Sequence, residues 1–213
     1  MNTFVIFSGG EIFDYSVVSR NISHYVVICA DSGLYHCKKL DIFPHVVIGD
    51  FDSYKGEIYP ESKVIKSSPE KDDTDTMLCV KYAIEKGAKE IKIYGGLSGR
   101  LDHTIANIQT LKYCAERKVS AEINDGLNRA LVQGEKSYCQ YLKDDSKYFS
   151  VFSLTDKVFI RELSGVKYPL EKYYLTSGFP LGVSNEITSD RATLEVSGGY
   201  ALIIFSKKQE PFS

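Results

Sequence analysis

The segment VVIGDFDS, residues 46–53, places two aspartates two positions apart directly after a run of valine and isoleucine. If that run is a buried strand, Asp50 and Asp52 point the same way at its carboxyl end, because residues i and i+2 of an extended chain share a face. Two carboxylates so close raise each other's pKa and cost stability unless a cation lies beside them. The pair therefore indicates a site for a divalent metal ion.

Further acidic residues follow other apolar runs or open the next helix. Asp31 stands in ADSG, and KDDTDT contributes Asp72, Asp73 and Asp75. Ligands of open α/β sheets bind outside the carboxyl ends of the strands, so we expect these segments to meet at one edge. Oxygen ligands without neighbouring His or Cys suit Mg²⁺, which is held by carboxylates, water and substrate phosphates. The alternative for any single aspartate is a turn or a helix N-cap, and for Asp73 both interpretations stay open.

The segment GGLSGRLDH, residues 95–103, has the features of a phosphate site. Its glycines expose backbone N–H groups, Arg100 can bind phosphate oxygens in bidentate fashion, and the expected helix presents its positive end to an anion. It lacks the P-loop and G-x-G-x-x-G patterns, so an ordinary glycine turn is the alternative. Asp102 either binds metal or caps the helix and orients Arg100. For His103 a structural role is preferred over that of a general base.

Short β-branched runs alternate with helical stretches as far as about residue 125. The expected strands are TFVIFS, HYVVICAD, HVVIGD, KVIKS, EIKIYGG and SAEIND. Most are nearly continuous apolar runs, which is typical of a parallel sheet covered on both faces. Helices are expected from Thr74 to Gly87 and after Arg100. This order predicts an α/β fold with an open, mainly parallel, Rossmann-like sheet.

The pattern changes after about residue 126, where helix signals fade. The segments KYFSVFSL, KVFIREL, KYYLTSG and ATLEVSGGYALIIFS are bounded by Gly, Ser, Asn and Asp. Such spacing is typical of an antiparallel sandwich or barrel. We therefore expect a second, all-β sandwich domain, with the boundary between residues 118 and 130.

Composition excludes some classes of partner. A net charge of −2 and a pI near 6.1 give no broad basic field, which disfavours nucleic acid and anionic membranes as partners. Five cysteines without a C-x-x-C pair argue against a disulfide framework or structural zinc, and predict reduced thiols in a cytoplasmic protein. The first apolar run is too short for a signal peptide or a membrane span.

Together, ADSG, VIGDFDS, KDDTDT and GGLSGRLDHTIANI occur in the order and spacing of the thiamine pyrophosphokinase family. The later LGVSNEIT and SGGYALIIF resemble the carboxyl-terminal domain of that family, so the resemblance covers nearly the whole chain. It implies transfer of the pyrophosphoryl group of ATP to the hydroxyl of thiamine, giving thiamine diphosphate and AMP. It also implies a nucleotide-binding catalytic domain over residues 1–125, a thiamine-binding domain over 126–213, and a homodimer with thiamine bound at the subunit interface.

Carried over by position, the resemblance assigns roles to residues of each motif. The implied magnesium ligands and catalytic acids are Asp50, Asp52 and Asp75, with Asp72 as a further catalytic acid. The residues implied to lie at the nucleotide are Asp31, Thr74, Arg100, Asp102 and His103. The residues implied to contact thiamine are Ser184 and Asn185, with Lys71 as a further candidate. The chain has no tryptophan, so aromatic stacking on thiamine falls to Tyr or Phe.

Two other functions remain as alternatives. The first is a non-catalytic sensor of thiamine or nucleotide, although such a binder has little reason to keep mutually repelling carboxylates. The second is a magnesium-dependent nucleotide hydrolase or nucleotidyl transferase on the same scaffold, since a fold does not determine its function.

Overall fold

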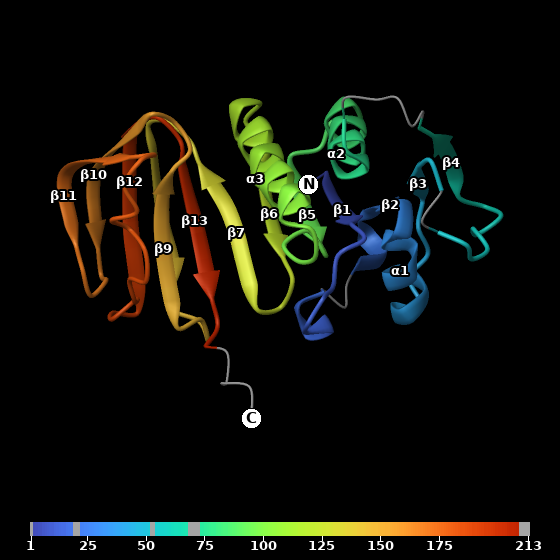
Figure 1. Ribbon diagram of the computed structural model, residues 1–213, viewed down its shortest axis with the longest axis horizontal. Coiled ribbons are helices and arrows are strands. Elements are labelled where there is room, and N and C mark those ends of the chain that lie inside the picture. Colours follow the sequence, from blue (N-terminus) through green and yellow to red (C-terminus); the bar gives the residue numbers. More distant parts are fainter. Residues whose placement is uncertain (1, 19–21, 52–53, 68–72, 209–213) are drawn as a thin grey trace. The chain divides into compact units, whose positions relative to one another are not determined.

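The chain divides into two compact units, Met1–Gly126 and Leu127–Ser213 (Figure 1). The structure is a computed structural model, and it describes residues 2–18, 22–51, 54–67 and 73–208. The first unit is mixed α/β with a mainly parallel sheet, and the second consists of antiparallel strands. The sequence predicted this succession of fold classes. No helix in the described ranges is long and apolar enough to cross a membrane.

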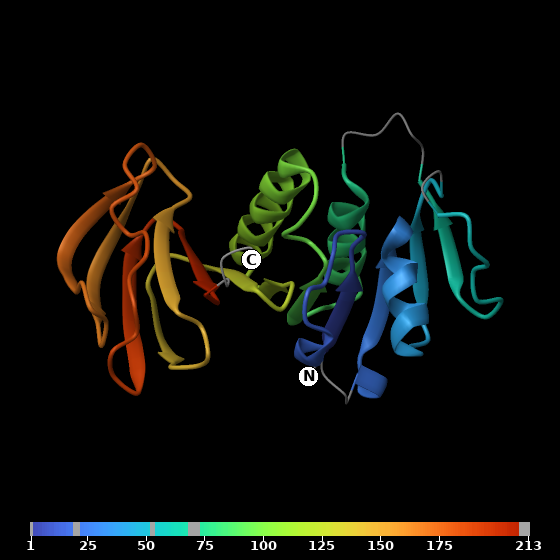
Figure 2. The ribbon, with the colours of Figure 1, turned by 60° about the horizontal axis from the view of Figure 1, so that its bottom comes forward.

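All the strands predicted in the first unit are present and run side by side (Figure 2). They are β1 (Thr3–Phe7), β2 (Val26–Ala30), β3 (Val46–Gly49), β4 (Lys63–Lys66), β5 (Glu90–Tyr94) and β6 (Ser120–Asn124). Their order is β4-β3-β2-β1-β5-β6, and neighbouring strands pair in parallel. The chain runs outward from β1 to β4 and then returns to β5 beside β1. The strand order therefore reverses between β1 and β5.

Most of these strands are buried, as their apolar sequences predict, but β4 is different. Lys63, Val64 and Lys66 are exposed, and Val64 has 41% of its surface accessible. β4 pairs only with β3 in the strand order, so it is the edge of this part of the sheet. Its charged residues suit an edge, because lysine discourages pairing with another chain.

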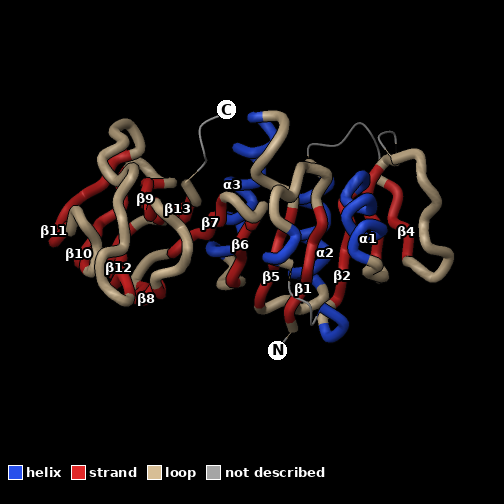
Figure 3. The backbone as a smooth tube through the Cα atoms, turned by 90° about the horizontal axis from the view of Figure 1, so that it is seen from below, coloured by secondary structure: helices blue, strands red, loops and turns tan. Residues whose placement is uncertain are grey.

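Helices cover both faces of the parallel sheet. They are α1 (Leu34–Leu40), α2 (Asp75–Glu85) and α3 (Leu101–Glu116), with short 3₁₀ turns η1 (Tyr15–Val17), η2 (Ile22–His24) and η3 (Asp31–Gly33). Phe7 packs in one cluster with Leu34 of α1, whereas the next residue, Ser8, contacts Thr76 of α2 through hydroxyls 2.7 Å apart. Successive strand residues point to opposite faces, so α1 and α2 lie on opposite sides of the sheet (Figure 3). α3 packs against α2 and β6.

Two antiparallel sheets form the second unit. The strands are β7 (Asn128–Gln133), β8 (Ser137–Leu142), β9 (Tyr148–Ser153), β10 (Lys157–Ser164), β11 (Leu170–Thr176), β12 (Arg191–Gly198) and β13 (Ala201–Ser206). β7, β13 and β9 pair in that order, and the other sheet has the order β11-β10-β12-β8. The sequence analysis missed β7 and β8. No residue of β8 is fully buried, so its apolar signal is weak.

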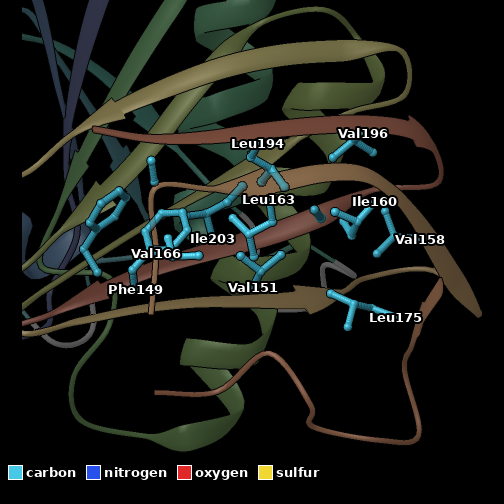
Figure 4. Packing of buried hydrophobic residues seen from close by; sticks show 13 residues of the cluster. Phe149, Val151, Val158, Ile160, Leu163, Val166, Leu175, Leu194, Val196 and Ile203 are labelled. Carbon is cyan, nitrogen blue, oxygen red and sulfur yellow. The ribbon is translucent and has the colours of Figure 1, made fainter. Parts of the chain in front are cut away.

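One hydrophobic cluster joins the strands of both sheets of this unit (Figure 4). Phe149 and Val151 come from β9, Ile160 and Leu163 from β10, and Ile203 from β13. The ring of Phe149 lies 5.1 Å from that of Phe205 and 5.6 Å from that of Tyr141. Burial of such rings against one another is a main stabilising contribution in a small all-β unit.

The variant Phe149→Ala should destabilise the protein by about 3–5 kcal/mol, because it removes a buried ring and leaves a cavity. Urea denaturation followed by circular dichroism measures the change. Phe179→Ala is the matched control, since Phe179 is 64% exposed. An equal effect of the two substitutions would show that the cluster does not hold this unit together.

Candidate functional site

Gly49, the last residue of β3, brings the acidic segments of the first unit together. A Cβ atom at Gly49 would lie 2.9 Å from Cβ and 3.1 Å from Cα of Asp31. The Gly49 carbonyl accepts a hydrogen bond from the N–H of Ser67 at 2.9 Å, and the Ser67 hydroxyl donates to Oδ1 of Asp75 at 3.2 Å. Asp50 follows Gly49 in the chain. The segments that carry Asp31, Asp50 and Asp75 therefore lie together at the carboxyl ends of β2, β3 and β4.

Asp31 has an unusual backbone conformation. Its φ angle is +43°, in a region that aspartate adopts more readily than most side chains, and the residue is only 8% exposed. The turn that it opens packs under β1, because a Cβ at Gly33 would lie 2.0 Å from the Phe7 carbonyl oxygen. Conformations of this kind cluster at functional sites, where surrounding packing holds them in place.

The amino-terminal end of α2 supplies the next group of predicted residues. Thr74 is the N-cap, and its hydroxyl accepts a hydrogen bond from the N–H of Met77 at 3.2 Å. Asp73 is therefore not the N-cap that its sequence position allowed, and its carboxylate pairs with Lys81 at 2.6 Å instead. Asp75 lies in the first turn, where the positive end of the helix stabilises its charge.

Three of the predicted site residues lie outside the described residues: Asp52, Lys71 and Asp72. Within the described ranges, no group of three or more His, Cys, Asp and Glu residues is arranged to hold a metal ion. Asp50 and Asp75 are the described members of the predicted magnesium set. Their carboxylates are of the donor type that Mg²⁺ prefers, so the described part of the site fits the ion in chemistry.

Arg100, the N-cap of α3, and Asp102, in its first turn, form a bidentate ion pair. Nη2 of Arg100 lies 2.5 Å from Oδ2 of Asp102, and Nε donates to Oδ1 at 3.1 Å. These hydrogen bonds hold the pKa of the exposed Asp102 carboxyl below its usual value and raise the pKa of Arg100. Two roles were considered for Asp102, metal binding and orientation of Arg100. These hydrogen bonds favour the orientation of Arg100. His103 is exposed and its N–H donates to Oδ1 of Asp102 at 3.0 Å, and its role stays a prediction.

The turn after β1 also belongs to this edge, and the sequence analysis missed it. A Cβ at Gly9 would lie 2.1 Å from the Ser32 hydroxyl oxygen, so Gly9 lies directly against the ADSG segment. The N–H of Gly10 donates to the Gly95 carbonyl at 2.8 Å. The signal that could have found this turn is the SGG sequence at the end of the first apolar run.

The two predicted thiamine contacts of the second unit differ in their surroundings. Ser184 is exposed with a φ angle of +57°, and its N–H donates to the Ser150 hydroxyl at 3.1 Å. Asn185 is 4% exposed, and its side-chain amide bonds to both backbone groups of Tyr168, at 2.9 and 2.8 Å. Its Oδ1 also accepts from the N–H of Glu186. The Asn185 side chain therefore ties its own loop to Tyr168, and direct contact with thiamine stays a prediction.

Two family models match successive parts of the chain. The model described as "Thiamin pyrophosphokinase, catalytic domain" matches residues 20–123, and the model described as "Thiamin pyrophosphokinase, vitamin B1 binding domain" matches residues 139–201. The chain belongs to the thiamin pyrophosphokinase family. All the acidic segments gathered at Gly49 lie in the part that matches the catalytic domain.

Members of the thiamin pyrophosphokinase family are similar to the chain over most of their length. The thiamine pyrophosphokinase of Bacillus subtilis is 29% identical over 190 residues, which cover 86% of this chain and 88% of that protein. Thiamin pyrophosphokinase 1 of Caenorhabditis elegans is 27% identical and covers 79% of this chain and 71% of that protein. The crystal structure of the Bacillus subtilis protein superimposes with a TM-score of 0.88, at 28% identity, over 98% of this chain and all of that one. The enzyme from Geobacillus thermodenitrificans gives 0.85 at 26% identity, with both chains covered completely.

Substitution of Gly49 by alanine tests the close approach at the acidic edge. Because the new methyl group meets the backbone of Asp31, Gly49→Ala should lower the free energy of unfolding by about 1–3 kcal/mol. Gly178→Ala is the control, since a Cβ at Gly178 meets nothing within 4 Å. Both free energies follow from urea unfolding curves. Equal stability of the two variants would contradict tight packing of Asp31 against β3.

Proposed function

We propose that this chain is a thiamine pyrophosphokinase, which transfers the pyrophosphoryl group of ATP to the hydroxyl of thiamine and releases AMP. The observation that carries the proposal is the gathering of Asp31, Asp50 and Asp75 around Gly49, in a chain that matches both domain models of one family. A non-catalytic sensor has little reason to keep several acidic segments at one edge of the sheet, because neighbouring carboxylates repel each other.

We assign nucleotide binding with catalysis to one domain and thiamine binding to the other. Residues 1–125 form a Rossmann-like domain for nucleotide binding and catalysis, and residues 126–213 form a β-sandwich for thiamine. The reversal of strand order between β1 and β5 supports the first assignment, since ligands of such sheets bind at that point. The matches to the catalytic and vitamin B1 binding models fall on either side of this boundary and support both assignments.

Magnesium is the metal that we propose for the acidic edge, held by Asp50, Asp75 and Asp52. When bound, the ion neutralises charge on the phosphates of ATP. The carboxylates supply oxygen ligands, and Ser67 keeps Asp75 in place through its hydrogen bond. Asp72 and Asp75 are the candidates to accept the proton of the thiamine hydroxyl.

Arg100 is proposed to bind the phosphates from the other side. Asp102 holds its guanidinium at the start of α3, where the positive helix end also attracts anions. Asp31 and Thr74 adjoin the metal ligands, and His103 lies in the exposed first turn of α3 beside Asp102. In pyrophosphoryl transfer, positioning and charge stabilisation contribute more than a strong base.

Thiamine is proposed to bind beside Ser184 and Asn185, with Lys71 as a further contact and the site shared between the subunits of a homodimer. The loop before Ser184 exposes Phe179, Leu181 and Val183, which supports a role in binding or assembly. We also propose a cytoplasmic location, supported by five cysteines that are free thiols.

The direct test is a reaction of the purified protein with ATP, Mg²⁺ and thiamine, with products separated by anion-exchange chromatography. We expect AMP and thiamine diphosphate in equal amounts, and no AMP when thiamine is left out. AMP or ADP formed regardless of thiamine would identify a nucleotide hydrolase. Binding of thiamine without any nucleotide product would identify a sensor.

Two substitutions of aspartate by asparagine test the proposed metal ligands. Asp50→Asn and Asp75→Asn should each lower turnover by about 100-fold or more, because a neutral amide is a poor ligand for Mg²⁺ and removes charge where the transition state needs it. Asp73→Asn is the matched control from the same segment, since the Asp73 carboxylate pairs with Lys81 at a partly exposed position. It should stay within about twofold of wild-type turnover. Near wild-type rates for both ligand variants at saturating Mg²⁺ would refute the assignment.

A further inference from the structure

Two glycine turns meet where the strand order reverses. Gly10 follows β1, Gly95 follows β5, and the N–H of Gly10 donates to the Gly95 carbonyl at 2.8 Å. A Cβ at Gly10 would lie 2.4 Å from the Gly95 oxygen, and a Cβ at Gly95 would lie 2.5 Å from the Gly10 oxygen. Neither position has room for a side chain. The two backbones are therefore in direct contact at the point where ligands of open α/β sheets bind.

A buried histidine of α1 holds the first of these turns. Nε2 of His36 lies 2.8 Å from the Gly10 carbonyl oxygen, and Nδ1 lies 2.7 Å from the Tyr15 hydroxyl. Because a carbonyl only accepts, Nε2 carries the proton, and Nδ1 accepts from Tyr15. His36 is 8% exposed, and burial lowers its pKa, which favours this neutral form. Each ring nitrogen thus has a defined partner.

A buried amide holds the second turn from the opposite face of the sheet. Nδ2 of Asn107 donates to the Gly96 carbonyl at 2.9 Å, and Asn107 is 4% exposed. Asn107 belongs to α3, which packs with α2, whereas His36 belongs to α1 on the other side. The backbone after β1 and the backbone after β5 are therefore each fixed by one side chain.

We propose that His36 is a positioning residue for nucleotide binding: by fixing the Gly10 carbonyl, it holds the turns after β1 and β5 in the arrangement that receives the phosphates of ATP. The inference rests on the proposed function. Its physical basis is preorganisation, since a turn ordered during folding loses no further conformational entropy when the nucleotide binds. Tyr15 acts one step further away, by keeping the His36 proton on Nε2.

Three variants separate this role from simple packing. His36→Leu replaces the imidazole with an apolar side chain that has no hydrogen-bond donor. His36→Gln keeps an N–H that can reach the Gly10 carbonyl. Cys37→Ala is the control, because Cys37 is also buried in α1 but contacts Cys29 rather than the turn. For each variant, isothermal titration calorimetry gives Kd for ATP with Mg²⁺, steady-state kinetics gives KM for both substrates, and thermal melting gives Tm.

We expect His36→Leu to raise Kd and KM for ATP about tenfold, because the partly buried Gly10 carbonyl loses its hydrogen-bond donor. KM for thiamine should change less than about twofold, and His36→Gln should restore ATP binding to within about threefold of wild type. Cys37→Ala should lower Tm without weakening ATP binding. Unchanged ATP affinity in His36→Leu, or an equal loss in Cys37→Ala, would overturn the inference.

Calorimetry measures ATP binding without turnover, so it tests the role of His36 separately from the proposed kinase activity. A wild-type protein that binds ATP but makes no AMP from thiamine would refute the kinase, while the comparison of ATP affinities would still decide the role of His36. A wild-type protein with full activity, whose His36 variants bind ATP normally, would refute only the positioning role.

Discussion

The close approach of β2 to β3 at Gly49 is the constraint on which the acidic edge depends. Asp31 packs where a side chain of residue 49 would otherwise lie, and the Gly49 carbonyl holds Ser67, which in turn bonds Asp75. One position without a side chain thus brings together the segments that carry these aspartates. The positive amino-terminal end of α2 stabilises the charge of Asp75.

The acidic edge and the glycine turns adjoin each other. Gly9 lies against Ser32 of the ADSG segment, and Ser8 bonds Thr76 in the first turn of α2. The strands on the β2–β4 side therefore supply negative charge, and the turns after β1 and β5 supply backbone without side chains. A phosphate chain with a cation beside it needs both kinds of surface next to each other, since the cation binds carboxylates and the phosphates approach backbone N–H groups.

Buried amides have a consistent role in the two units. Asn107 and Asn185 each use the side chain to fix a backbone carbonyl of another segment, and Gln133 bonds both the Leu194 carbonyl and the Tyr141 hydroxyl. A buried amide left without partners would be costly, so each of these residues must be matched to its neighbours. The side chain of Asn185 is bonded to the backbone of Tyr168, whereas the adjacent Ser184 is exposed.

The sequence by itself determined the fold classes, the strands β1 to β6 and the helices α2 and α3, because hydrophobic periodicity and helix capping are local properties. It also indicated that the acids meet at one edge, since they follow parallel strands. It did not reveal α1, which has only seven residues, or β8, whose residues are not fully buried. The tertiary structure alone decided that β5 lies beside β1, that Ser67 holds Asp75, and that His36 holds Gly10. The pairing of β5 with β1 and the bond from His36 to Gly10 join segments distant in the chain, and the Ser67–Asp75 bond links residues eight positions apart. Their geometry follows from packing rather than from any local pattern.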